Sequence, residues 1–121
     1  MIEFEKLGLS RNTIDTLQRK GYKTPTVIQE KCIPLLLEGK VDVIGQAQTG
    51  TGKTASFSLP IIESIKPGKG YVQALVLAPT RELAIQVSKE IESLQGQKKL
   101  SVLSVYGGSS ISQQIKALRK G

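Results

Sequence analysis

The residues best suited to chemistry lie in a glycine-rich stretch, residues 47–54, which ends in a lysine and a threonine. Gly50 and Gly52 let backbone N–H groups turn inward around a phosphate, and a helix that begins there directs its positive end at the same group. Lys53 would reach the β- and γ-phosphates as a point charge, and the Thr54 hydroxyl would be a ligand for Mg²⁺. The alternative is a plain glycine-rich turn that carries a surface lysine.

The spacing follows the pattern G-x-x-x-x-G-K-[ST], except that Ala47 stands where the first glycine belongs. Lys53 and Thr54 are the candidates for catalysis. The predicted phosphate-binding residues are Ala47, Gln48, Thr49, Gly50, Thr51, Gly52, Lys53 and Thr54.

An apolar run, residues 41–44, precedes this loop and is predicted to be a buried strand, and residues 55–65 are predicted to be a helix. Two more units repeat this order: predicted strands at 71–78 and 100–106 are each followed by a helical pattern. Two helices come before the first unit. The sequence therefore predicts an α/β fold with a parallel sheet, in which the loops after the three strands share one face.

Capping signals mark the predicted helix ends. Ser10 can begin a helix that runs to about Lys20, and Gly21 can end it in a left-handed conformation. Thr26 and Gln29 fit a capping box at the start of a second helix, which Pro34 is expected to kink or restart.

Spacing also predicts which side chains are buried. The expected inward positions are Ile14 and Leu17 in the first helix, Leu83, Ala84, Val87, Ile91 and Leu94 after the second strand, and Ile111, Ile115 and Leu118 in the last helix. Cys32 is expected to be a small buried residue, and Lys98-Lys99 a solvated loop.

Composition limits the possible functions. The 121 residues form at most one small domain, and 17 basic against 10 acidic residues give a net charge of +7, which favours polyanionic partners. The chain has no histidine, which excludes histidine general-base chemistry, and its single cysteine excludes an internal disulfide. No apolar run is long enough to span a membrane, so the cytoplasm is the default location.

Several segments together resemble the DEAD-box RNA helicases. The loop form A-x-T-G-x-G-K-T is that family's own variant, so Ala47 supports the resemblance. Residues 21–29, GYKTPTVIQ, resemble the family's Q motif, and Phe4 lies where the family has an upstream aromatic residue. Residues 79–86, PTRELAIQ, and the glycine pair 107–108 match two further motifs.

The resemblance implies a role for each matching residue and a RecA-like P-loop NTPase fold. Gln29 would hydrogen-bond the adenine edge of ATP, Phe4 would stack on the ring, and Tyr22 and Lys23 would line the same pocket. The residues implied to contact the RNA sugar–phosphate backbone, without reading bases, are Pro79, Thr80, Arg81, Gly107 and Gly108. Residues 1–39 would form a Q-motif helical segment and residues 40–121 a partial RecA-like ATP-binding domain.

Each role has a structural alternative. Gln29 could serve only as the capping-box partner of Thr26, although both roles can coexist. Phe4 could be a core anchor, Arg81 could belong to a solvated first helical turn, and the glycine pair 107–108 could be a plain turn.

The sequence lacks the Asp-Glu-Ala-Asp motif that would hold Mg²⁺ and position water, since its only aspartates are Asp15 and Asp42. The resemblance therefore implies the first part of a helicase's first RecA-like domain, without the second domain, and an isolated piece with little or no ATPase activity. Later strands of a family member lie among these three, so unpaired edges and self-association are expected. The competing interpretations are a stand-alone ATP- or RNA-binding module without catalysis, and an unrelated P-loop kinase or transport ATPase, which the predicted adenine selection disfavours.

Overall fold

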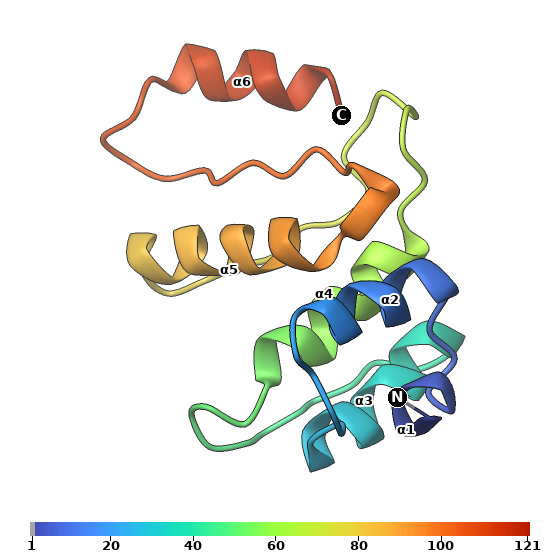
Figure 1. Ribbon diagram of the computed structural model, residues 1–121. Helices are drawn as coiled ribbons and strands as arrows, with labels where there is room; N and C mark the ends of the chain where they lie inside the picture. The colour runs from blue at the N-terminus through green and yellow to red at the C-terminus, as the bar shows by residue number, and fades with distance from the viewer. Residues whose placement is uncertain (1) are drawn as a thin grey trace.

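The computed structural model describes residues 2–121, and in this range it contains helices joined by irregular segments (Figure 1). The helices are α1 (Ile2–Glu5), α2 (Arg11–Arg19), α3 (Val27–Glu38), α4 (Lys53–Ser64), α5 (Arg81–Leu94) and α6 (Ile111–Arg119), with a 3₁₀ turn, η1 (Gly96–Lys98), after α5. None of these helices is long and apolar enough to cross a membrane.

The predicted parallel sheet is wrong for residues 2–121, because no strand forms in this range. Residues 42–48, 72–78 and 99–106 are irregular and make no backbone–backbone hydrogen bond with one another. A strand exists only through a ladder to a neighbour, so apolar β-forming residues alone do not create one. As a result, Leu75 and Leu77 are 79% and 86% exposed.

The helix ends follow the capping signals closely. The Ser10 and Thr80 hydroxyls accept hydrogen bonds from the Thr13 and Leu83 N–H groups at the starts of α2 and α5. Gly39 ends α3 with a φ of +70°. The helix does not restart at Pro34, since α3 continues through that residue.

One hydrophobic core joins both predicted segments of the chain. Phe4, Leu17 and Ile33 from the first 39 residues are fully buried with Leu59 of α4 and Leu94 of α5. The remaining core members are Leu7, Leu9, Ile14, Ala55, Ile62, Val87, Ile91 and Leu100. The inward positions predicted for α2 and the C-terminal part of α5 are thus confirmed, as is the burial of Cys32.

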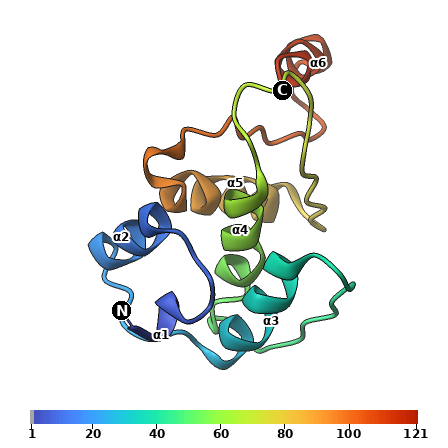
Figure 2. The ribbon, with the colours of Figure 1, turned by 90° about the vertical axis from the view of Figure 1, so that its right-hand side faces the viewer.

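Helix α6 differs from the prediction, because its apolar side chains are open to solvent. Ile111, Ile115 and Leu118 are 72%, 44% and 39% exposed. Figures 1 and 2 show α6 at the edge of the molecule, away from α1, α2 and α3. The apolar residues of α6 thus have the spacing predicted for a helix with one buried face, but no other element of residues 2–121 covers that face.

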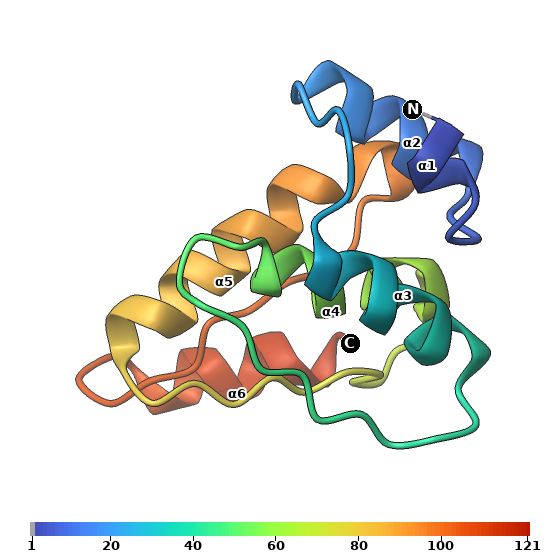
Figure 3. The same cartoon turned by 90° about the horizontal axis from the view of Figure 1, so that it is seen from below.

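The three loops predicted to share a face do so. In Figures 1 and 3 the loops before α4, α5 and α6 all lie on the left of the molecule. Each of these helices begins on that side, so their N-terminal N–H groups and positive dipole ends are available there.

Candidate functional site

The glycine-rich loop turns tightly just before α4. Gly50 and Gly52 have φ values of +82° and +81°, a region that side-chain-bearing residues rarely adopt. The Thr51 hydroxyl donates to the Gln48 carbonyl and closes the turn. Ala47 is half-buried, whereas Gln48 and Thr49 are exposed, and Thr49 makes no side-chain hydrogen bond among the described residues.

Lys53 and Thr54 are the first two residues of α4. Lys53 is exposed and Thr54 is half-buried. Among the hydrogen bonds and ion pairs of residues 2–121, none uses the Lys53 amine or the Thr54 hydroxyl. Both groups are therefore available to a ligand beside the unpaired N–H groups of the first helical turn.

Gln29 connects the segment 21–29 directly to the glycine-rich loop, residues 47–54, which we call the phosphate loop after its expected ligand. Its side chain is 2% exposed, its Nε2 donates to the Gly52 carbonyl at 3.3 Å, and its Oε1 accepts from the Thr26 N–H at 3.0 Å. A Cβ atom at Gly52 would lie 2.2 Å from that Nε2, so the contact requires glycine. The Thr26 hydroxyl beside it is buried and has no hydrogen-bond partner among the described residues.

Phe4 and Tyr22 pack against each other. Phe4 is fully buried, and its ring meets the Tyr22 ring edge to face, with centroids 6.1 Å apart. The Tyr22 hydroxyl donates to Glu90 Oε1 at 3.2 Å. Burial, with a further contribution from the Glu90 carboxylate, raises the pKa of Tyr22 above 10.0. Lys23 is exposed.

A second group of predicted site residues gathers at the starts of α5 and α6. Arg81 reaches across to the glycine pair, where its Nη2 donates to the Gly107 carbonyl at 2.9 Å. Thr80 caps α5 through its oxygen, so its own hydroxyl hydrogen remains free for an acceptor. Pro79 and Gly108 are exposed alongside.

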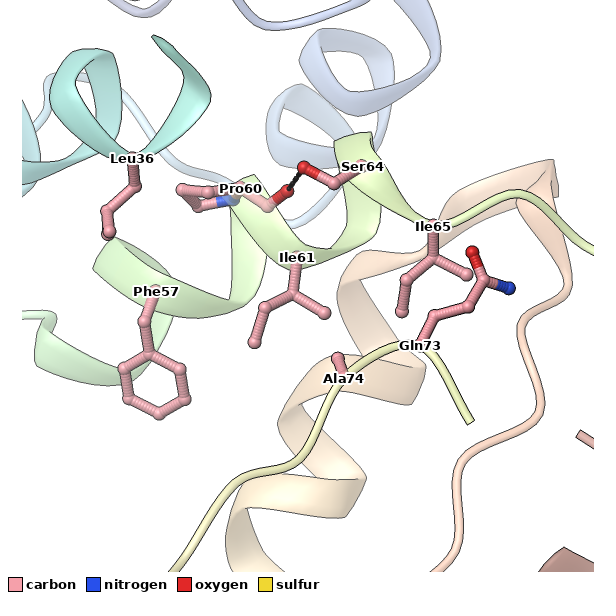
Figure 4. A pocket seen from close by; sticks show the side chains of 8 residues that line it. All are labelled: Leu36, Phe57, Pro60, Ile61, Ser64, Ile65, Gln73 and Ala74. Carbon is pink, nitrogen blue, oxygen red and sulfur yellow. Dashed lines mark hydrogen bonds between the residues drawn. The ribbon is translucent and has the colours of Figure 1, made fainter. Parts of the chain in front are cut away.

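Two cavities open between the helices and the irregular segments. The larger, about 860 Å³, has Pro79, Thr80 and Arg81 in its wall. The smaller, about 370 Å³, lies between α4 and the segment that carries Ala74 (Figure 4). Phe57 and Ile61 project into it from one side of α4, and Ile65, directly after the helix, lies beside them (Figure 4). Neither cavity includes residues 47–54; the wall of the smaller is mainly apolar, and that of the larger mixes apolar with polar side chains.

Sequence reasoning missed two residues that hold the site loops, and it missed one that caps the far end of α4. Tyr106 lies under the Arg81 guanidinium, and Gln114 of α6 is buried against the Tyr106 backbone. Lys98, predicted to be solvated, donates to the Ile62 and Glu63 carbonyls at the end of α4. Capping the last carbonyls of a helix suits a lysine, but the partners lie more than 30 residues apart in sequence, so no local signal existed.

The chain is similar to proteins of known family along nearly its whole length. The sequence model of the DEAD/DEAH box helicase family matches residues 26–121. The ATP-dependent RNA helicase CshA of Listeria monocytogenes is 56% identical over 120 residues, which are 99% of this chain and 23% of that protein. The chain therefore spans about a quarter of that relative's length.

Solved structures agree in fold. A DEAD box protein from the hyperthermophile Methanococcus jannaschii matches 98% of this chain and 32% of its own, with a TM-score of 0.93 and 48% identity. Dbp5 of S. cerevisiae, bound to RNA and ADP BeF3, matches 77% of this chain and 24% of its own, with a TM-score of 0.72 and 37% identity.

Proposed function

Since the chain belongs to the DEAD/DEAH box helicase family, we propose that it is the ATP-binding part, and one RNA-contacting face, of an ATP-dependent RNA helicase. The observation that carries this proposal is the hydrogen bond between Gln29 and Gly52. It joins the residue expected to recognise a base to the loop expected to hold phosphates. An unrelated glycine turn would not need a buried amide fixed to its last glycine.

The phosphate loop fits ATP with Mg²⁺. Positive φ values at Gly50 and Gly52 form a backbone cradle, and the free Lys53 amine would hold the β- and γ-phosphates. The Thr54 hydroxyl is an oxygen ligand of the kind that Mg²⁺ takes, and the ion would complete its shell with phosphate oxygens and water. Bound Mg²⁺ would neutralise phosphate charge.

Gln29 can serve both the fold and the base. A glutamine amide has two N–H donors and two acceptor lone pairs, and the bonds to Gly52 and Thr26 use one of each. One donor and one acceptor remain, which is what the adenine edge requires and what the guanine edge would mismatch; because Gln29 is 2% exposed, adenine would reach them once the side chains that cover this amide move aside. Stacking of Phe4 on adenine stays a prediction, because a base could reach this fully buried ring only if the core around it opened.

The starts of α5 and α6 would bind the RNA backbone. Arg81, the free hydrogen of Thr80 and the helix N-termini all favour phosphate groups, and the exposed Pro79, Gly107 and Gly108 permit close approach. None of these groups distinguishes one base from another. The net charge of +7 adds a sequence-independent attraction.

The whole protein would couple ATP hydrolysis to local separation of RNA strands. The 121-residue chain should bind ATP without turning it over, because its two aspartates are placed elsewhere. Asp15 pairs with Arg11 at 3.1 Å on α2, and Asp42 is exposed before the loop. The exposed apolar segments should also make the chain self-associate.

Nucleotide binding tests the proposal. Titration with a fluorescent ATP analogue should show saturable, Mg²⁺-dependent binding that unlabelled ATP displaces better than GTP. Lys53→Ala should weaken binding by about tenfold or more, since a hydrogen bond to a charged group contributes about 1.5–3 kcal/mol. Lys31→Ala, which removes an exposed lysine of α3, is the charge-matched control and should bind normally.

Equal binding by Lys53→Ala and the parent chain would refute the phosphate assignment. Equal displacement by ATP and GTP would refute the role of Gln29. Steady ATP turnover that depends on Lys53 would contradict the expectation that the chain only binds.

A further inference from the structure

The two loops expected to meet RNA are joined by one side chain, which rests on an aromatic ring. The Arg81 Cζ lies 5.2 Å from the centroid of the Tyr106 ring, within the range in which a guanidinium is attracted to an aromatic face. The same guanidinium donates to the Gly107 carbonyl. Arg81 therefore belongs to α5 but is held in place by the loop before α6.

Tyr106 is itself fixed, although the segment that carries it has no strand partner. Its N–H donates to Gln114 Oε1 at 3.1 Å, and its carbonyl accepts from Gln114 Nε2 at 3.4 Å. The Gln114 side chain thus supplies both bonds that a neighbouring strand would give. Gln114 is 9% exposed, and its Nε2 also donates to the Ser110 carbonyl at the start of α6.

These contacts leave the positive charge of Arg81 without a neutralising partner among the described residues. The bond to Gly107 uses one of the five N–H donors of a guanidinium. The ion pairs among residues 2–121 are Arg11–Asp15 and Lys40–Glu38, so no described carboxylate neutralises Arg81. A Cβ atom at Gly108 would lie 3.2 Å from Arg81 Nη2, so the second glycine leaves room for the group.

We propose that Tyr106 is a positioning residue for RNA binding: its ring orients the Arg81 guanidinium so that the free donors of Arg81 face a backbone phosphate. This inference rests on the proposed function, because it assumes that Arg81 contacts RNA. The ring face carries the effect and the hydroxyl does not, so phenylalanine should replace Tyr106 and leucine should not.

The test measures the affinity of the 121-residue chain for a fluorescein-labelled oligouridylate by anisotropy over a series of salt concentrations. Arg81→Gln should weaken binding by about tenfold and reduce the salt slope by about 0.7, the loss of one phosphate contact on a single strand. Tyr106→Leu should weaken binding about two- to fivefold, and Tyr106→Phe should bind like the parent. Tyr71→Leu is the control, since Tyr71 is exposed and not paired with an arginine.

The double variant separates positioning from general stability. Tyr106→Leu should cost nothing further when Arg81→Gln is already present, because its effect passes through Arg81. Additive losses, or equal weakening by Tyr106→Phe and Tyr106→Leu, would overturn the inference. Unchanged RNA affinity in Arg81→Gln would instead overturn the proposed RNA contact itself.

A spectroscopic measurement keeps the inference testable if Tyr106→Leu does not fold. A guanidinium over an aromatic face has side-chain proton resonances shifted upfield by the ring. In the parent chain the Arg81 side-chain N–H resonance should show this shift, and Tyr106→Phe should preserve it. An Arg81 resonance at the position of a free arginine in the parent chain would overturn the inference.

Discussion

The two halves of the candidate site are built in different ways. The phosphate loop begins α4, whose Leu59 and Ile62 lie in the hydrophobic core, and Gln29 reaches that loop from a buried position on α3. The loops proposed to contact RNA lie beside exposed apolar segments, where side chains such as Gln114 and Arg81 supply the contacts. Packing fixes the first half. In the second half α5 also reaches the core through Val87, Ile91 and Leu94, but the loop before α6 is held by a few polar bonds.

This difference predicts that the phosphate loop is more rigid than the loop before α6. Core packing involves many atoms, so the phosphate side should lose its shape only when the domain unfolds. Each polar bond near Tyr106 contributes only about 1 kcal/mol net, so the loop between Tyr106 and α6 should open locally well before that. Binding of a phosphate backbone across both loops would then order this half.

The largest expected effect contrasts the same substitution in the two regions. Leu59→Ala removes a fully buried side chain of α4 and should lower the free energy of unfolding by about 2–5 kcal/mol. Leu77→Ala removes a side chain that is 86% exposed and should change it by less than about 0.5 kcal/mol. Urea unfolding followed by circular dichroism measures both. Similar losses would mean that the segment around Leu77 is packed in solution and that the comparison fails.

The second prediction contrasts two glycines of the phosphate loop with nearly equal φ. Gly52→Ala should cost about 2 kcal/mol, because its Cβ would collide with the amide of Gln29, which is too buried to swing away. Gly50→Ala should cost about 1 kcal/mol, since a Cβ there meets nothing within 4 Å and only the backbone is strained. Thermal melts with and without ATP compare the two.

Gly52→Ala is also expected to weaken ATP binding more than Gly50→Ala does. The reverse order would mean that the contact between Gln29 and Gly52 does not order the loop for ATP.

Helices α2 to α6 could be predicted because their signals are local, whereas the short α1 was not predicted. Ser10, Thr80 and Gly39 cap helix ends within a few residues, and the motif residues lie at fixed spacing. The residues 71–78 contain the apolar pattern of a strand, but pairing needs a partner from elsewhere in the chain, and none is present in residues 2–121. For the same reason the apolar residues of α6 predicted a buried face that does not exist.

The hydrogen bonds that hold the site loops could not be predicted from local sequence patterns either. Gln114 lies in α6 between apolar positions, and nothing in its spacing indicates that its amide faces Tyr106. Arg81 and Gly107 were assigned separately to RNA, without the bond that joins them. Residue types predict which groups a binding site would use, whereas contacts between distant segments decide how those groups are held.

A third prediction concerns the exposed apolar half. Leu75→Lys with Leu77→Lys should reduce self-association of the chain by about tenfold, roughly 1.4 kcal/mol, because charges on an apolar edge oppose pairing between copies. Leu35→Lys, on the α3 surface of the packed half, is the control and should leave association unchanged. Sedimentation velocity at several concentrations provides the measurement. Equal effects of the two changes would mean that the contact between copies is not confined to the segment that carries Leu75 and Leu77.

The smallest expected effect lies at Tyr22, which links the segment before α3 to α5 through Glu90. Burial and the Glu90 carboxylate raise the pKa of Tyr22 above 10.0, so folding favours the neutral phenol. Its contribution to stability is therefore fully present below pH 10 and is lost as pH rises through the folded-state pKa. Tyr22→Phe should lower the free energy of unfolding by about 1 kcal/mol at pH 7 and make its decline above pH 10 shallower.

Tyr71→Phe, at an exposed position, should change neither value. Urea midpoints at pH 7 and at about pH 10.5 measure both quantities, and an unchanged decline in Tyr22→Phe would mean that Glu90 does not hold this phenol in solution.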